Sequence, residues 1–346
     1  MKDIGVKHME GMNQAVGSQQ TTNQPTEGLA ESQKPVCYFV VPCYNEEEAL
    51  PETSQRLLAK LTYLIESDKL HPESRILFID DGSKDLTWSI IESLHEQNTH
   101  FVGIKLARNR GHQNALFAGL MFAVDYCDIS ISLDADLQDD IEAIDEFIER
   151  YFEGCQIVFG VRDDRTTDTV FKRTSAGLFY NLIRLLGADT IKDHADYRLM
   201  SKPALIALSK YPEVNLFLRG MVIDIGYKTG VVYYTRGVRF AGVSKYPLKK
   251  MIAFAFDGIT SFSIKPLRLM LVLGLFISFV SLLGLMYALI SYFFLTTVSG
   301  WTTTILSIWF LGGIQVFCIG LIGEYVGKSY IETKRRPKYI IDKTVI

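Results

Sequence analysis

Short apolar runs alternate with longer amphipathic segments along residues 36–160. The short runs are rich in β-branched and aromatic residues, which is typical of strands, whereas apolar residues at every third or fourth position indicate helices. The predicted strands are 36–42, 75–80, 101–107, 128–134 and 155–160, and the predicted helices are 46–66, 85–97, 111–126 and 141–154. This alternation predicts an α/β fold on a mostly parallel, doubly wound (Rossmann-like) sheet.

A second pattern begins near the C-terminus, where no Asp, Glu, Lys, Arg or His occurs between Leu269 and Gly323. A helix that crosses a membrane needs about 20 apolar residues. Two stretches meet or approach that length, 269–295 and 305–323, and a polar but uncharged segment joins them. A buried hairpin in a soluble core is the alternative, but soluble cores do not run so far without a charge. The pattern therefore predicts two transmembrane helices.

Positive charges flank both predicted spans and are absent from the loop between them. They lie before the first span at Arg236, Arg239, Lys245, Lys249, Lys250, Lys265 and Arg268, and after the second at Lys328, Lys334, Arg335, Arg336 and Lys338. Such residues favour the cytoplasmic side of a membrane. We therefore expect a multi-pass protein of the cell membrane whose α/β domain is cytoplasmic.

The remaining composition divides the chain into five parts. Residues 1–34 are rich in Gln, Thr, Ser, Gly and Asn, and we expect them to be disordered. Residues 35–245 form the cytosolic α/β domain, and 246–266 form an amphipathic segment in the membrane interface, for which a plain surface helix is the alternative. The hairpin then occupies 267–325, and a basic cytosolic tail occupies 326–346.

Net charge and cysteine usage exclude two other classes of protein. The formal net charge is -3, so no basic field indicates a nucleic-acid partner. The five cysteines are scattered without the paired spacing of a zinc site, and we expect reduced, buried thiols.

Polar side chains gather where three of the predicted strands end. They are Pro42, Tyr44, Asn45 and Glu46 after the first strand, Asp80, Asp81, Ser83 and Asp85 after the second, and Asp134, Asp136 and Gln138 after the fourth. Each group alone could cap a helix. Ligands of such sheets bind outside the carboxyl ends of the strands, so we expect these groups around one crevice. Facing carboxylates are tolerated when a cation or a donor-rich ligand lies among them.

Asp134 and Asp136 form the clearest of these groups. They follow an apolar strand and straddle a turn, so that their carboxylates can converge, and Gln138 extends the pattern. Oxygen ligands of this kind suit Mg²⁺ or Mn²⁺, which also bind substrate phosphate oxygens. His112 and His194 lie near the same segments, but neither has a partner at helical spacing, and we do not count them as catalytic.

Four segments resemble, in order and spacing, the family 2 glycosyltransferases of GT-A fold: VVPCYNEEEAL, FIDDGSKDLT, LARNRGHQNALFAGL and SLDADLQD. The chain is more closely similar to the polyprenyl-phosphate glycosyltransferases, which include the dolichyl-phosphate mannose synthases and bacterial proteins of the GtrB and CsbB type. The resemblance runs from about Val36 to Tyr339 and includes both predicted spans. No single motif is specific, but their combination is.

The resemblance implies a role for each matching residue. It implies that Pro42, Tyr44, Glu46, Ile79 and Asp81 hold the nucleoside, that Ala135 lies against the nucleotide, that Asp134, Asp136 and Gln138 bind the metal, and that Arg162 faces the diphosphate or acceptor phosphate. Three further segments, DHADYRLM, FLRG and RFAGVSKY, match acceptor-side elements of the family, although Ala195 stands where Gly is common. They contribute Asp196, Arg198, Arg219, Arg239, Ser244 and Lys245.

The implied reaction is inverting, metal-dependent transfer of a sugar from a nucleotide sugar to undecaprenyl phosphate at the cytosolic face of the bilayer. UDP-glucose and UDP-N-acetylglucosamine are the expected donors, and the product would serve cell-envelope glycan modification. A phosphate acceptor is already largely ionised and needs little base assistance, so Asp196 either orients the acceptor or acts as a base. A second copy of the chain and a flippase for the lipid-linked sugar are further candidate partners.

Two other functions compete with this one. A processive polysaccharide synthase would carry a Q-x-x-R-W element, and none of the three tryptophans has that context. A non-catalytic membrane scaffold with a degenerate transferase domain would not need the intact acidic pair or the intact nucleoside residues. Release of UDP that depends on a lipid acceptor separates the enzyme from the scaffold.

Arg239 generates a prediction about the acceptor, because it shortly precedes the expected interfacial segment. A charge-assisted contact to phosphate contributes about 1.5–3 kcal/mol, or roughly a ten- to hundred-fold effect. We expect Arg239→Ala to cut transfer to polyprenyl phosphate at least about tenfold while UDP-sugar affinity changes much less. Arg239→Lys should restore only part, since Lys lacks the bidentate fork. Calorimetry of donor binding beside lipid-acceptor kinetics checks this, and a parallel loss of donor affinity would assign Arg239 to the diphosphate.

Overall fold

The structure is a computed structural model that describes residues 34–162, 194–214, 216–235, 265–294 and 300–346. Several expectations lie outside these residues and stay predictions. They are the disordered segment before Lys34, nearly all of the interfacial segment 246–266, and the acceptor-side roles of Arg239, Ser244 and Lys245.

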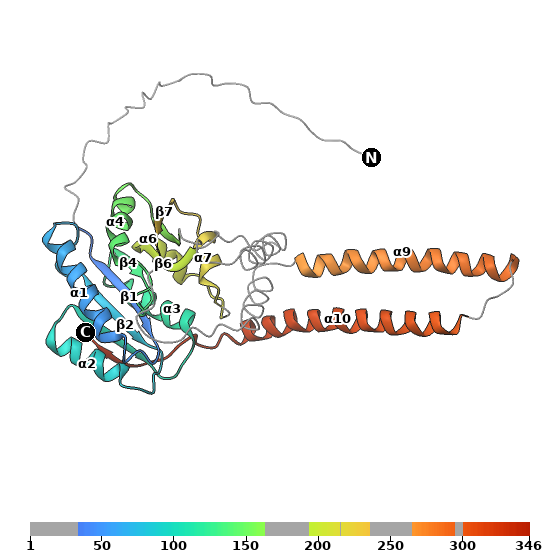
Figure 1. Cartoon of the computed structure of the whole chain (residues 1–346), viewed down its shortest axis with the longest axis horizontal. Coiled ribbons are helices and arrows are strands. Elements are labelled where there is room, and N and C mark those ends of the chain that lie inside the picture. The colour runs from blue at the N-terminus through green and yellow to red at the C-terminus, as the bar shows by residue number, and fades with distance from the viewer. Residues whose placement is uncertain (1–33, 163–193, 215, 236–264, 295–299) are drawn as a thin grey trace, which may run out of the picture. The chain divides into compact units, whose positions relative to one another are not determined.

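One mixed sheet organises the α/β domain (Figure 1). Its strands are β1 (Cys37–Cys43), β2 (Arg75–Asp80), β3 (Phe101–Leu106), β4 (Ile129–Ser132), β5 (Ile157–Arg162), β6 (His194–Ser201), β7 (Thr229–Tyr234) and β8 (Ile341–Val345). Across the sheet their order is β7-β5-β6-β4-β1-β2-β3-β8. The pairs β1–β2, β1–β4, β2–β3 and β5–β7 are parallel, whereas β6 and β8 run antiparallel to their neighbours. The mostly parallel α/β sheet predicted from the sequence is confirmed.

Helices connect the strands at the predicted places, with later starts. They are α1 (Leu50–Glu66), α2 (Thr87–Gln97), α3 (His112–Ala123), the 3₁₀ turn η1 (Ile141–Ala143), α4 (Ile144–Phe152), α6 (Lys202–Ser209), α7 (Leu218–Asp224), α9 (Lys265–Phe294) and α10 (Trp301–Lys334). The first helix was predicted from residue 46 but begins at Leu50, with Pro51 in its first turn. Asn45 precedes it with a φ of 55°, which interrupts a helical path.

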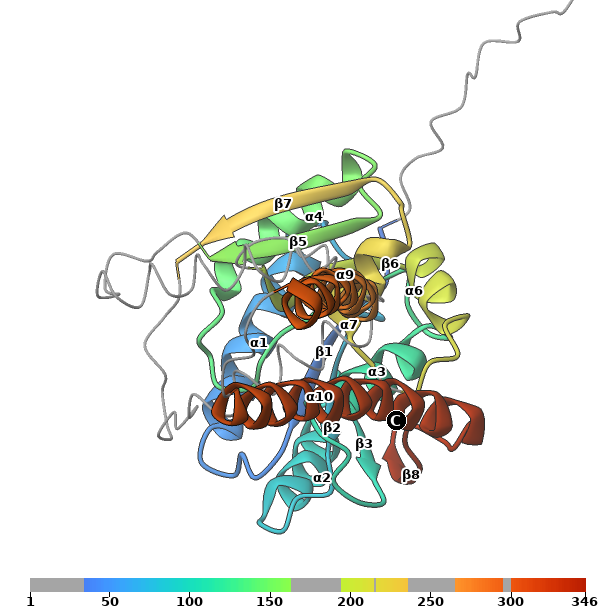
Figure 2. The same cartoon turned by 90° about the vertical axis from the view of Figure 1, so that its right-hand side faces the viewer.

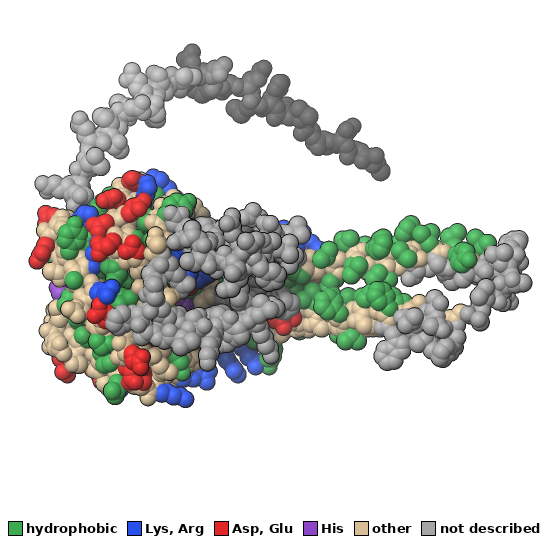
Figure 3. All heavy atoms as spheres, viewed as in Figure 1, with side chains coloured by type: hydrophobic (Ala, Val, Ile, Leu, Met, Phe, Trp, Pro, Cys, Tyr) green, Lys and Arg blue, Asp and Glu red, His purple; other side chains and the backbone are tan. Residues whose placement is uncertain are grey.

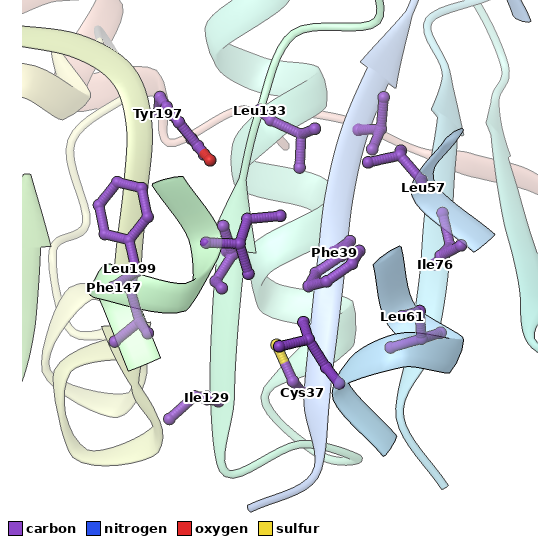
Figure 4. Packing of buried hydrophobic residues seen from close by; sticks show 14 of the residues in the cluster. Cys37, Phe39, Leu57, Leu61, Ile76, Ile129, Leu133, Phe147, Tyr197 and Leu199 are labelled. Atoms are coloured by element: carbon purple, nitrogen blue, oxygen red, sulfur yellow. The ribbon is translucent and has the colours of Figure 1, made fainter. Parts of the chain in front are cut away.

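Side chains alternate between two cores along the central strands. Phe39 of β1 and Ile76 of β2 face a core that includes Leu57 and Leu61 of α1 and Phe147 of α4 (Figure 4). The neighbouring strand residues face the opposite core, where Val40, Leu77 and Ile79 pack with Leu116, Leu205 and Met221. All seven residues of β1 are buried, because helices cover both faces of a central parallel strand.

The chain changes direction across the sheet at β1. The chain places β2 and β3 on one side of β1 and returns to place β4 on its other side. Ligands of open α/β sheets bind outside the carboxyl ends of the strands at such a switch point. The loops after β1, β2 and β4 therefore surround the expected crevice.

Strand β8 was missed in the sequence, where residues 326–346 read as a basic tail. The strand pairs with β3, with Ile104 opposite Thr344 and Lys105 opposite Lys343 (Figure 2). Its side chains are exposed or half-buried, since an edge strand has a neighbour on one side only. A short polar strand of this kind has no hydrophobic alternation by which to recognise it. The residues after α10 therefore belong to the sheet.

The two C-terminal helices carry an apolar surface that the protein leaves uncovered. Large hydrophobic side chains are exposed along the described parts of α9 and α10 (Figure 3), among them Phe276, Phe310 and Phe317. Among the described residues, Phe310–Lys334 is the one segment that is long and apolar enough to cross a membrane. The first predicted span lies within α9, which has 30 residues, and stays a prediction.

Gly119 generates a prediction about stability, because α3 approaches the sheet most closely there. A Cβ atom at Gly119 would lie 2.5 Å from Cδ1 of Ile79 and 2.7 Å from Cγ1 of Val40. We expect Gly119→Val to destabilise the fold by about 1–3 kcal/mol through overpacking, and Gly119→Ala to cost less. Thermal unfolding of the full-length protein in detergent measures both, and an unchanged midpoint for the valine variant would contradict this packing.

Candidate active site

A cavity of about 370 Å³ opens at the carboxyl ends of β1, β2 and β4. Seven of the residues predicted for the nucleotide and the metal line it: Pro42, Tyr44, Glu46, Asp81, Asp134, Ala135 and Asp136. His112 and Gly111 complete the side toward α3. Segments far apart in the sequence thus surround one crevice, as the switch-point rule requires.

Hydrogen bonds between backbone N–H groups and side-chain oxygens join the loop after β1 to the loop after β2 and the start of α2. The Asn45 N–H donates to Oγ of Ser83 over 2.9 Å, and Oδ1 of Asn45 accepts from the Lys84 N–H over 3.0 Å. The Glu46 N–H donates to Oγ1 of Thr87 over 2.9 Å. The two loops are therefore one rigid wall of the cavity, on which the Tyr44 ring is 42% exposed and free to stack on a planar ligand.

Asp81 holds the loop that precedes α3. Its two carboxylate oxygens accept the N–H groups of Arg110 and Gly111 over 2.7 and 2.8 Å. Burial raises the pKa of Asp81, although those two hydrogen bonds oppose the rise. Asp81 lines the cavity, but its carboxylate already accepts two backbone hydrogen bonds and thereby shapes the cavity wall.

Ile79 does not have the surroundings that were predicted for it. Its side chain is fully buried and packs in the core against α3, next to Gly119. It therefore cannot contact a nucleoside in the cavity. The resemblance assigned the position correctly to the end of β2, but the alternation of side chains turns Ile79 inward.

The turn after β4 presents Asp134 and Asp136. The Asp134 N–H donates to Oδ2 of Asp139 over 3.4 Å, and the Gln138 N–H donates to Oδ1 of Asp136 over 3.2 Å. Leu137 has a φ of 57°, so the chain turns sharply between Asp136 and Gln138. The strand ends at Ser132, earlier than the predicted end at Asp134, because both aspartates already belong to this turn.

The surroundings of Asp134 disfavour the ionised form of its carboxyl group. Burial, and next the negative charge of Asp139, raise the pKa of Asp134 to about 6. Among the described residues, no group of three or more His, Cys, Asp or Glu side chains is arranged to hold a metal. A hard cation that keeps substrate and water oxygens needs only one or two protein carboxylates. Asp134 and Asp136 fit that requirement, and a cation would relieve the repulsion.

Gln138, the expected third metal ligand, lies beside a different cavity. That cavity has a volume of about 560 Å³ and is also lined by Arg56, Tyr63, Asp139 and Glu142. The backbone N–H of Gln138 is nevertheless hydrogen-bonded to Asp136, which lines the first cavity. The metal role of Gln138 therefore stays a prediction.

Three cationic or polar side chains contact the carboxylate of Asp196 on β6. Arg198 donates from Nη2 to Oδ1 over 2.6 Å, and Arg219 donates from Nε and Nη2 to the two oxygens over 3.3 and 3.1 Å. Nε2 of His112 lies 3.5 Å from Oδ2. Burial alone would raise the pKa of Asp196, but His112, Arg219 and Arg198 outweigh it and hold the pKa well below its usual range.

His112 links the two carboxylate groups of the site. Its Nε2 also lies 3.8 Å from Oδ1 of Asp134. Burial would lower the pKa of His112, but Asp196 and Asp134 raise it above its ordinary value. His112 was not counted as catalytic because it has no partner at helical spacing, whereas its two partners come from the turn after β4 and from β6. Its position at the start of a helix that borders the crevice was the available signal.

Two further arginines differ in accessibility. The Arg198 side chain was predicted to bind the acceptor phosphate, but it is fully buried and bonds to Asp196 and to the carbonyl of Leu218, which excludes that contact. Arg162, at the end of β5, donates from Nε to the hydroxyl of Tyr234 over 3.2 Å, and its side chain is 30% exposed. Arg162 and the 31% exposed Arg219 remain reachable by an anion.

Comparison with known proteins gives the same picture for most of the chain. Residues 38–208 match the family described as glycosyl transferase family 2, and residues 265–329 match the GtrB C-terminal hairpin. The chain is similar to the uncharacterized glycosyltransferase YkoT of Bacillus subtilis, with 53% identity over 89% of this chain and 92% of that protein. It is also similar to the bactoprenol glucosyl transferase of Shigella phage SfII, with 42% identity over 88% of this chain and 97% of that one. The prophage bactoprenol glucosyl transferase homolog of Escherichia coli is 42% identical over 88% and 98%.

The raised pKa of Asp134 generates a prediction about stability and pH. Its folded-state pKa of about 6 lies above the unfolded value, so ionised Asp134 lowers stability as pH rises through about 6 and has no such cost below about 4. The carboxyl is 36% exposed, so solvent screens part of the effect. We expect Asp134→Asn to stabilise the metal-free protein by about 1–2 kcal/mol at pH 7.5.

Unfolding of the full-length protein in detergent and chelator, at pH 7.5 and pH 4.5, tests this. The gain at pH 7.5 should be much smaller at pH 4.5, because the folded-state carboxyl is then largely protonated and pH 4.5 lies only slightly above the unfolded-state pKa. An equal gain at both pH values would show that the asparagine acts through packing and that repulsion is not the cause.

Proposed function

Because the chain belongs to glycosyl transferase family 2 and carries the C-terminal hairpin of GtrB proteins, we propose that it transfers a sugar from a nucleotide sugar to a polyprenyl phosphate at a membrane. It is a glycosyltransferase. The observation that carries the proposal is the junction at His112. Its ring lies near Asp134, which forms the acidic pair of a donor site with Asp136. The same ring lies near Asp196, whose cationic neighbours suit a phosphate acceptor.

The donor half of the crevice suits a nucleoside diphosphate sugar. Tyr44 offers an exposed side chain, and Asp134 and Asp136 line the same cavity. A bound Mg²⁺ or Mn²⁺ would supply positive charge to the diphosphate as it leaves. Asp134 and Asp136 would hold that ion with the phosphate oxygens of the substrate. The relatives named bactoprenol glucosyl transferases support glucose as the sugar and UDP-glucose as the donor.

The acceptor half must bind a dianion and offset its repulsion from the donor diphosphate. Arg219 and Arg162 are partly exposed cations beside the crevice, and we assign the acceptor phosphate to them together with the predicted Arg239, Ser244 and Lys245. An oxygen of the acceptor phosphate forms the new bond to the anomeric carbon of the sugar. The bond between that carbon and the phosphate oxygen of the nucleotide breaks in the same step. The configuration at the anomeric carbon is inverted, and the nucleoside diphosphate leaves.

Asp196 orients this half of the site and does not take up a proton. Its pKa is held well below the usual range, so it is a weak base, and an ionised phosphate needs none. Its two oxygens fix the guanidinium of Arg219 and the ring of His112. Asp196 thereby sets the angle at which Arg219 meets the acceptor.

The C-terminal hairpin would hold the enzyme where its lipid acceptor lies. The uncharged stretch from Leu269 to Gly323 and the basic residues at both ends support a two-helix anchor with the catalytic domain in the cytoplasm. A polyprenyl phosphate has its phosphate at the membrane surface and its chain in the bilayer. An anchored domain therefore meets the acceptor without extracting it from the lipid.

Transfer assays on the full-length protein test the proposal. We expect labelled sugar to pass from UDP-glucose to undecaprenyl phosphate in vesicles with Mg²⁺ or Mn²⁺, with release of UDP that requires the lipid. Other nucleotide sugars, offered in parallel, decide the sugar. Hydrolysis alone, or transfer that extends a polymer, would contradict the proposal.

Asp136→Asn tests whether the acidic pair takes part in the reaction. Replacing one carboxylate oxygen by an amide keeps the shape of the turn but weakens binding of a hard cation. We expect transfer to fall by about a hundredfold or more while the protein stays folded and in the membrane. Turnover near the wild-type rate with metal present would remove the acidic pair from the reaction.

A further inference from the structure

The segment that leaves helix α10 contacts the loop that leads to Arg219. Oε2 of Glu332, in the last turn of α10, accepts the N–H of Val214 over 2.8 Å. Nζ of Lys338 donates to the carbonyl of Tyr211 over 3.0 Å. Tyr211 and Val214 lie between α6 and α7, and α7 begins at Leu218, one residue before Arg219.

The same loop is held at its other end by the site itself. The Leu218 N–H donates to Oε1 of Gln113, the neighbour of His112 on α3, over 3.2 Å. The Leu218 carbonyl accepts from Nη1 of Arg198 over 3.4 Å. Arg219 therefore reaches Asp196 from a backbone that is fixed on one side by the site and on the other by the end of α10.

Lys338 and its neighbour also bind the returning chain to α3. The Lys338 ammonium lies 4.2 Å from the centroid of the Phe117 ring, and the ring of Tyr339 packs edge-on against the same ring at 6.4 Å. The chain then enters β8 and the sheet. The end of α10 is thus positioned relative to α3, which carries His112, as well as relative to the Arg219 loop.

We propose that Glu332 and Lys338 are positioning residues that set Arg219 on Asp196, so that the last turn of the hairpin completes the acceptor half of the site. This inference rests on the proposed function for its kinetic consequence. A displacement of the loop would move the Arg219 guanidinium relative to the acceptor, and small misplacements of a charged group cost reaction rate steeply. The donor wall of Tyr44, Asn45 and Ser83 shares none of these contacts.

Replacing Glu332 tests the proposal against a matched control on the same helix. Glu324 also lies on α10 and forms an ion pair with Lys328 at 3.9 Å, away from the loop. We expect Glu332→Ala to lower the rate of transfer to undecaprenyl phosphate by about tenfold with little change in UDP affinity, and Glu324→Ala to leave the rate unchanged. Glu332→Gln should keep most of the rate, because its amide oxygen still accepts the Val214 N–H.

A double mutant separates positioning from general stability. If Glu332 acts through Arg219, then Glu332→Ala should have no further effect on transfer in an Arg219→Ala background. Additive losses in the double mutant would overturn the proposal. Equal rates for Glu332→Ala and Glu324→Ala would overturn it as well.

Hydrogen exchange gives a readout that does not depend on the reaction. We expect amides in residues 211–219 to exchange faster in Glu332→Ala than in the wild type or in Glu324→Ala, because Val214 loses its acceptor. Unchanged exchange in this loop would refute the positioning role even if transfer fell. Faster exchange in a protein whose wild type transferred no sugar would support the positioning role while refuting the proposed function.

Discussion

A buried carboxylate that must be neutralised organises the part of the site around β6, α3 and α7. Asp196 is only 13% exposed, and a charge so far from water is tolerated only when paired and hydrogen-bonded. Its partners come from β6, α3 and α7, so the three elements are drawn to one point. The path of the loop before α7, the inward turn of Arg198 and the placement of His112 all follow from that requirement.

The pKa values of two carboxyl groups in the site are shifted in opposite directions. Cations hold the pKa of Asp196 low, whereas burial and Asp139 raise that of Asp134. His112 lies between them and is attracted to both. Divergent pKa values within one crevice are the usual sign of divided roles. Here Asp196 is paired with the protein's own cations, while the charge of Asp134 is less fully compensated, in line with the metal role proposed for it.

The first five strands and the polar groups that follow three of them could be predicted from the sequence because their signals are local, whereas β6, β7 and β8 were not predicted. Apolar runs mark the central strands, and the acidic turn after β4 follows directly from one of them. The acceptor side could not be predicted in the same way. Arg198 is turned inward by the alternation of β6, and His112 finds its partners across the sheet, so neither fact is visible in spacing along the chain. The turn before Gln138 could not be predicted either, because the positive φ of Leu137 depends on tertiary context.

The edge position of β8 has a consequence for how the protein is made. A ribosome delivers β3 long before it delivers the hairpin, and β8 emerges only after both long helices. Until then the outer edge of β3 has unpaired backbone groups that could recruit a strand from another chain. Residues 341–345 close that edge, and the charged side chains of Asp342 and Lys343 disfavour pairing with a further strand. The sheet is therefore completed only after α9 and α10 have been made, and a chain that stalls before that point leaves the edge of β3 open to pairing with another chain.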